Sequence, residues 1–433
     1  MLKGLKTYFF STIILTSTAA WSQNLEDIYQ QVLQSDPRLL TESLGVEVLA
    51  ARQQQAFGAL LPQVSISSSW TENQRTVEGS SKESFAGERH SLSVQQALID
   101  MPKYYGWKIT EDRYEQKLLE QKDLRSKVRF DTIERYFNLL NAIDELALVR
   151  EEKESAEKTK EHIGALYQMQ RVKVTDFYEA EAQLDLVLSK EIDAMQKRDL
   201  AKEDLRELTN NPVKDISKLS ENNEFIQRAE NINEWSADSI SSNYALMALR
   251  KKVEAAQKEI DKQSAGHLPL LAIQLSKQKS DIGFENTAAS SSTTEVASLT
   301  FQVPLFSGGQ TSARVYEATS ILAINRAQYD MEKRRVNKES RDMFLHVNAT
   351  ARRIEATNKA IKSAQKAYQS MNRSFELGIA TVSQLLIARK AYSEAKREYM
   401  SAKYSYINGK AKLLHISGKL NDAALYEISK WLL

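Results

Sequence analysis

The chain has 433 residues, of which 42% are hydrophobic and 27% are charged, as in an ordinary folded protein. Its formal net charge is only +2, so the overall charge does not point to nucleic acid as a partner. It contains no cysteine, so packing alone has to hold the fold together. Beyond the N-terminus no run of 18 apolar residues occurs, and no transmembrane helix is predicted.

The first 22 residues have the pattern of a secretory signal peptide. Lys3 and Lys6 precede a short apolar stretch at 8–15, and the Ala-Trp-Ser sequence at 20–22 is a small-x-small cleavage site. An exposed N-terminal helix is the less favoured alternative. Cleavage after residue 22 removes two lysines and no acids, which leaves 57 basic and 57 acidic residues. The absence of cysteine excludes a lipid anchor at the new N-terminus, so we expect an exported protein that is not a lipoprotein.

Much of the chain occurs twice. The segment SLSVQQALIDMPK at 91–103 returns as SLTFQVPLFSGGQ at 298–310, which is an offset of 207 residues. Pro62 and Pro269 keep this offset, and later landmarks follow at 208. The sequence therefore predicts two tandem copies of one structural unit.

Both units have the same predicted plan of a helix, a β-hairpin and two long helices. The predicted bounds are a first repeat at 23–211 (helix 25–60, hairpin 62–100, long helices 104–210), an equatorial linker at 212–242, a second repeat at 243–417 (helix 243–265, hairpin 268–306, long helices 310–417) and a C-terminal equatorial segment at 418–433. No proline lies between 103 and 211 or after 304, so helices of about 65 residues and roughly 100 Å can form there. Helices of this length need partners along their whole length, as in a coiled coil.

The hairpin strands alternate between apolar and small polar residues. In the last strand, Leu299 and Phe301 alternate with Thr300 and Gln302. This pattern suits either a sheet on a soluble core or a transmembrane β-barrel, and export makes an outer membrane accessible. Four strands cannot close a barrel, and open sheet edges are not tolerated in lipid. If the strands span a membrane, several chains have to share one barrel, and three chains supply twelve strands.

No catalytic, cofactor-binding or metal-binding motif is present. The histidines show no metal-ligand spacing, and no nucleotide-binding glycine loop or nucleophile motif occurs. The sequence therefore predicts that the protein is not an enzyme and has no cofactor. The five histidines are His90, His162, His267, His346 and His415.

This organisation resembles the TolC family of outer-membrane efflux proteins. The segments that carry the resemblance are GALLPQVSIS at 58–67, YFNLLNAID at 136–144, GHLPL at 266–270 and FQVPLFSGG at 301–309. The resemblance implies a mainly α protein that forms a homotrimer, with one shared 12-stranded barrel in outer-membrane lipid and an α-barrel tunnel in the periplasm of a Gram-negative bacterium. It implies the exit channel of a tripartite efflux or type I secretion system, fed by a periplasmic adaptor and an inner-membrane pump of the RND, ABC or MFS class.

The resemblance also assigns roles to individual residues. It places adaptor docking at Met169, Gln170, Arg171, Leu377, Gly378 and Ile379, the pore aperture at Asp176, Gln384 and Ile387, and the strand-to-helix junction at Pro304, Gly308 and Gly309. Gln170 stands where the family turn has glycine, so a different turn geometry is possible there. Gln384 and Ile387 stand at positions that are acidic in TolC, so weaker block by divalent cations is expected.

One alternative comes from another functional class. A soluble periplasmic coiled-coil scaffold or adaptor would also contain long helices, although an adaptor normally has one helical hairpin and separate β-domains. The sequence leaves open which cargo is carried (drug, toxin, metal or protein) and which pump class supplies it.

Overall fold

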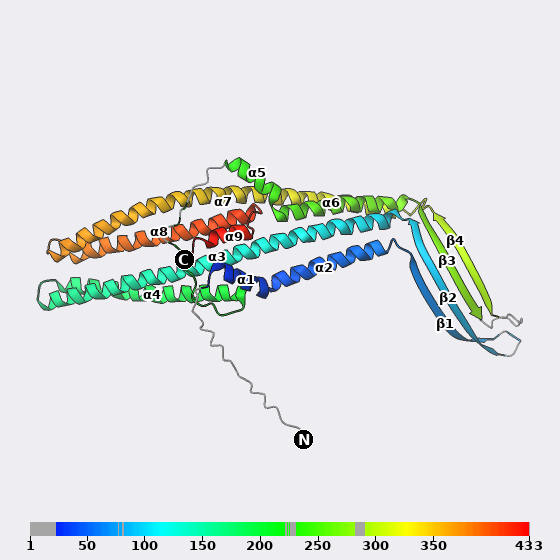
Figure 1. Ribbon diagram of the computed structural model, residues 1–433, viewed down its shortest axis with the longest axis horizontal. Helices are drawn as coiled ribbons and strands as arrows, with labels where there is room; N and C mark the ends of the chain where they lie inside the picture. The colour runs from blue at the N-terminus through cyan, green and yellow to red at the C-terminus, as the bar shows by residue number, and fades with distance from the viewer. Residues whose placement is uncertain are drawn as a thin grey trace, which may run out of the picture.

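The computed structural model describes residues 23–76, 78–79, 82–220, 223, 225, 231–281 and 291–432. The predicted signal peptide at 1–22 lies outside these residues. The molecule is elongated, with a β-sheet at one end and the tips of two helical hairpins at the other (Figure 1). No helix in the described ranges has both the length and the apolar composition needed to cross a membrane.

The sheet is antiparallel, and neither of its edge strands pairs with another strand of the described ranges. Its four strands follow chain order as β1 (Gln63–Arg75), β2 (Glu83–Ile99), β3 (Leu270–Asp281) and β4 (Ser292–Gln302). Apolar residues lie on one face, where Val64 pairs with Val94, and small polar residues lie on the other, where Ser65 pairs with Ser93. β4 ends before residue 306, the predicted limit of the hairpin, and Pro304 has no N–H with which to continue the ladder.

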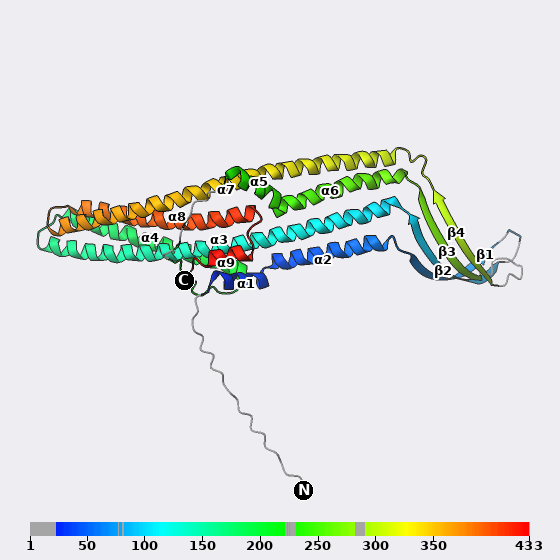
Figure 2. The same cartoon turned by 45° about the horizontal axis from the view of Figure 1, so that its top comes forward.

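The helices repeat in the same order in both halves. The first half contains α1 (Leu25–Ser35), α2 (Pro37–Gly58), α3 (Met101–Gln168) and α4 (Val174–Thr209), and the second contains α5 (Ile232–Ser242), α6 (Tyr244–Ser264), α7 (Gln310–Glu376) and α8 (Val382–Ile416), followed by α9 (Asp422–Ser429). A short 3₁₀ helix at Ala265–His267 follows α6. The two helices of more than 65 residues, α3 and α7, run the length of the helical body (Figure 2).

Two helical assignments differ from the sequence prediction. The helix predicted at 25–60 is divided in two, because Asp36 caps a new helix whose first residue is Pro37. Helix α5 lies inside the stretch predicted as a linker at 212–242, and it starts 207 residues after α1. The repeated helical pattern therefore begins again at Ile232 and not at residue 243.

The main apolar core lies midway along the molecule, where α1 and α9 meet the long helices. Tyr136 and Phe137 on α3 are fully buried there among apolar side chains of α1, α4, α8 and α9. The hydroxyl of Tyr136 lies 3.1 Å from the carbonyl of Gln23 and 3.2 Å from that of Ser217. The YFNLLNAID segment thus anchors the N-terminal residues and the linker to the helical body.

Candidate functional site at the tips of the helical hairpins

The two hairpins end in turns of the same hydrogen-bonded geometry. After α3, the amides of Gln170 and Arg171 donate to the carbonyls of Tyr167 (2.8 Å) and Leu166 (2.9 Å). After α7, the amides of Gly378 and Ile379 donate to the carbonyls of Phe375 and Ser374, both at 2.9 Å. Both sets of bonds form the Schellman motif that closes a helix C-terminus.

The Schellman motif requires a left-handed residue, and the two tips supply it differently. Gly378 has φ of 73°, which costs glycine little, whereas Gln170 has φ of 59° with a full side chain. The turn geometry at the first tip is therefore the same as at the second, although Gln170 stands where the second tip has glycine. Gln170 adds backbone strain of about 1–2 kcal/mol to the first tip.

Both tips present apolar side chains to solvent. The exposed fractions are 66% for Met169, 61% for Leu377 and 77% for Ile379. Gln170, Arg171 and Gly378 are exposed on the same two turns. All six residues expected to dock an adaptor therefore lie on accessible ends of the molecule.

The residues expected at the aperture have separate local environments. The Asp176 carboxylate accepts the amide of Lys173 at 3.1 Å, and the Gln384 side-chain oxygen accepts the amide of Thr381 at 2.9 Å. Each therefore satisfies a free backbone donor at the start of its helix, α4 or α8. Ile387 lies one turn further along α8 and is 66% exposed.

An apolar cluster joins the two hairpins close to their tips. Ile163 of α3, Ala180 of α4 and Val382 of α8 are buried against one another. The ring of His162 meets that of Phe375 edge to face, with 6.0 Å between the centroids. The hairpins α3–α4 and α7–α8 therefore pack side by side and are held by contacts between repeats.

Polar contacts from α8 to α3 continue this junction. The Arg389 guanidinium donates to the Glu152 carbonyl (2.5 Å) and to the Thr159 hydroxyl (3.1 Å). Arg397 pairs with the Glu152 carboxylate at 2.6 Å. Burial lowers the pKa of Arg389. These bonds compensate the cost of burying this charge only while α8 lies against α3.

Arg389 was not among the residues predicted from the sequence. The sequence feature that could have identified it is its position: Arg389 follows Val382 and Leu385 at spacings of three and four, so a charged residue lies on the apolar stripe of α8. A charge at such a position needs a partner on the neighbouring helix.

The strand-to-helix junction lies at the opposite end of α7. After Pro304, Gly308 and Gly309 have φ of 61° and 79°, and Gly309 is the N-cap of α7. Two successive left-handed residues turn the chain from β4 into the helix, and glycine adopts this conformation without steric cost.

In the described part of the chain, no group of three or more His, Cys, Asp or Glu residues is arranged to hold a metal ion.

Comparison with known proteins gives matches over nearly the whole chain. The family described as "Outer membrane efflux protein" matches residues 28–211 and 235–419, which are the two repeats. "Outer membrane protein TolC" of Salmonella enteritidis is 26% identical over 96% of this chain and 86% of its own length. "Alkaline protease secretion protein AprF" of Pseudomonas aeruginosa is 28% identical over 98% of this chain and 90% of its own.

Solved structures show the same fold. The CmeC outer membrane channel of Campylobacter jejuni superposes with a TM-score of 0.82 at 18% identity, covering 95% of this chain and 90% of its own. The tandem-repeat prediction and the resemblance to the TolC family are therefore confirmed. The chain belongs to the outer membrane efflux protein family.

Proposed function

We propose that this protein is the outer-membrane exit channel of a tripartite efflux or type I secretion system, and that it conducts cargo passively to the outside. The observation that carries the proposal is the match of both repeats to the efflux family, on a chain that joins an open sheet to two long helical hairpins. A periplasmic scaffold or adaptor does not account for this match. The relatives are channel proteins, and energy would come from an inner-membrane partner.

The open edges of the chain support a homotrimer. Within the described residues, strands β1 and β4 each have one unpaired edge, and a sheet in lipid has to close. Helices α2 and α7 lie at the two edges of the helical layer on the sheet side of the molecule. Both carry exposed apolar side chains that a neighbouring chain would cover, namely Leu40, Leu44 and Val48 on α2 and Ile324, Met331 and Leu345 on α7. Three chains would close one 12-stranded barrel above one helical tunnel.

The two faces of the sheet suit this arrangement. Val64 and Ile66 are exposed in the single chain, although both are large and apolar. Outer-membrane lipid would cover this face in the trimer. The face with Ser65, Ser67 and their polar neighbours would line the water-filled interior. The linker at 212–242 and the segment at 418–433 would form the equatorial belt, where Leu219 and Leu432 already pair in a β-bridge.

The hairpin tips are the proposed docking points for a periplasmic adaptor. Met169, Leu377 and Ile379 are exposed apolar side chains on turns with fixed geometry, and such residues bury well in a partner's groove. Replacement of Leu377 and Ile379 by glutamate should abolish export in a strain that lacks its own exit channel. The protein level in the outer membrane should stay unchanged. Full export by this variant would contradict docking at the tips.

Conductance measurements in planar lipid bilayers would test the channel function itself. Purified protein should insert and give discrete conductance steps. We expect weak block by divalent cations, because Gln384 and Ile387 carry no charge and the Asp176 carboxylate caps α4. A protein that gives no conductance steps contradicts the channel proposal. Strong divalent block contradicts only the expected weak block at the aperture, and not the channel itself.

A further inference from the structure

A large hollow lies between the helices on the sheet side of the molecule. Its volume is about 1070 Å³, and its lining comes from α2, α3, α6 and α7. These helices lie side by side in one curved layer (Figures 1 and 2). A hollow that touches all four helices of such a layer lies on its concave side. In the proposed trimer, the concave side faces the tunnel.

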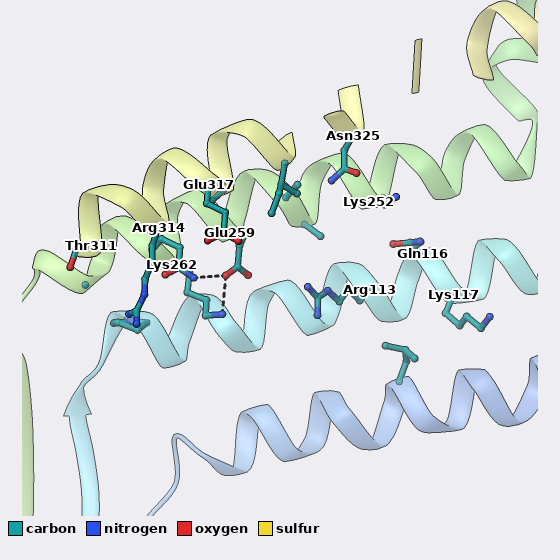
Figure 3. A pocket seen from close by; sticks show the side chains of 18 of the residues that line it. Arg113, Gln116, Lys117, Lys252, Glu259, Lys262, Thr311, Arg314, Glu317 and Asn325 are labelled. Atoms are coloured by element: carbon teal, nitrogen blue, oxygen red, sulfur yellow. Dashed lines mark hydrogen bonds and ion pairs between the residues drawn. The ribbon is translucent and has the colours of Figure 1, made fainter. Parts of the chain in front are cut away.

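The lining of this hollow carries an excess of positive charge. Figure 3 shows side chains that line the hollow, and all the charged ones among the lining residues belong to α3, α6 and α7. They are the basic residues Arg113, Lys117, Lys252, Lys262 and Arg314 and the acidic residues Glu120, Glu259 and Glu317. The excess is two positive charges per chain, whereas the predicted mature chain has equal numbers of basic and acidic residues.

Two of the carboxylates are already engaged within the wall. Glu259 accepts hydrogen bonds from Lys262 (3.0 Å) and Gln263 (2.6 Å). Although burial alone would raise the pKa of Glu259, these bonds hold it below its usual value, so the carboxylate stays ionised. Lys117 pairs with Glu120 at 3.2 Å and with Glu42 at 2.8 Å.

Two arginines make no such direct bonds, although Arg113 interacts electrostatically with Glu259. Within the described ranges, neither Arg113 on α3 nor Arg314 on α7 has an ion pair or a side-chain hydrogen bond, and both side chains are exposed. Both project toward the hollow from opposite sides of α6 (Figure 3). A guanidinium group presents its donors in a fork that matches a carboxylate.

We propose that this hollow transiently binds carboxylate-rich segments of a polypeptide cargo on its way from the tunnel into the barrel. The proposal rests on the channel function proposed above. The hollow is at the upper end of the size of small-molecule pockets and is open on one side. Arg113 and Arg314 lie on two helices of each chain and would recur three times around the tunnel. A flexible chain with several carboxylates can reach such charges together, whereas a small anion can reach only one or two.

The test uses the purified full-length protein in planar bilayers at low salt, with decaglutamate added on the barrel side. We expect decaglutamate to block the current, and decalysine of the same length to leave it unchanged. In the double variant Arg113→Gln/Arg314→Gln the half-blocking concentration should rise roughly tenfold, because the lining of each chain loses its excess of two positive charges. Arg113→Lys/Arg314→Lys should restore most of the block.

The matched control removes two arginines from the other side of the same helical layer. By helical periodicity, Arg250 on α6 and Arg334 on α7 lie about half a turn away from the residues that line the hollow. The Arg250→Gln/Arg334→Gln variant should be blocked by decaglutamate at the same concentration as the unmodified protein. Equal block of the unmodified protein and the Arg113→Gln/Arg314→Gln variant would overturn the site. Block by citrate at the same concentration as decaglutamate would overturn the polypeptide assignment. Channels that conduct but are not blocked contradict only this site, whereas the absence of channels contradicts the proposed function.

Discussion

Replacement of Arg389 by alanine should release α8 from α3. The guanidinium makes two hydrogen bonds across the junction between the repeats, to the Glu152 carbonyl and to the Thr159 hydroxyl. A hydrogen bond to a charged group contributes about 1.5–3 kcal/mol, and water replaces part of this when the helices separate. We therefore expect a loss of about 2–3 kcal/mol per chain. This loss shifts the equilibrium between packed and separated hairpins by roughly 30- to 150-fold.

Two measurements follow the change directly. Hydrogen exchange should become faster in the tip-proximal half of α8, and single-channel conductance should rise if this junction narrows the tunnel. Lys359→Ala is the matched control, because it removes one exposed ion pair with Glu355 within α7 and no contact between the hairpins. Unchanged exchange and unchanged conductance in Arg389→Ala would refute the reasoning, since the junction would then be held without this side chain.

Three further predictions concern stability. Gln170→Gly should slow hydrogen exchange at the first tip about fivefold, because it relieves the strain of the left-handed backbone. Gly378→Gln should accelerate hydrogen exchange at the second tip for the opposite reason. Unchanged exchange rates in both variants would count against backbone strain at Gln170. Gly418→Ala should destabilise the protein by at least about 2 kcal/mol, because φ of residue 418 is +64° and the new Cβ would lie 2.2 Å from the Ser242 carbonyl oxygen. Thermal unfolding measures this loss, and an unchanged melting temperature would contradict the prediction. Burial lowers the pKa of His415 to about 4, so stability should fall by up to about 3 kcal/mol as pH decreases from about 6.5 to about 4. His415→Gln should flatten this pH dependence, and an unchanged pH profile would argue against it.

Much of the architecture was predictable because it depends on local patterns. Period-two alternation identified the four strands, and the absence of proline allowed the two longest helices. The division at Pro37 was harder to foresee, since it depends on Asp36 acting as a cap within a continuous helical pattern. Helix α5 has few apolar residues and is held by tertiary contacts, such as the bond between Ser239 and Ser340 at 2.9 Å, which the sequence does not reveal.

The proposed functional surfaces were predictable only in part. Glycine identified the turn at Gly378, but Gln170 gives no local signal for a left-handed residue. The hydrogen bonds of Arg389 require α8 to lie against α3, and these helices are far apart in the sequence. The basic hollow likewise combines residues from separate helices, including Arg113 and Arg314, so no single segment shows its charge.

The central claim is that three chains share one barrel, because one chain leaves both sheet edges open. The most direct test is native mass spectrometry of the protein extracted in detergent from purified outer membranes. A species of three mature chains is the predicted result. A monomer or dimer, or a protein found free in the periplasm, would contradict the account, because the unpaired edges of β1 and β4 would then have to be closed in some other way.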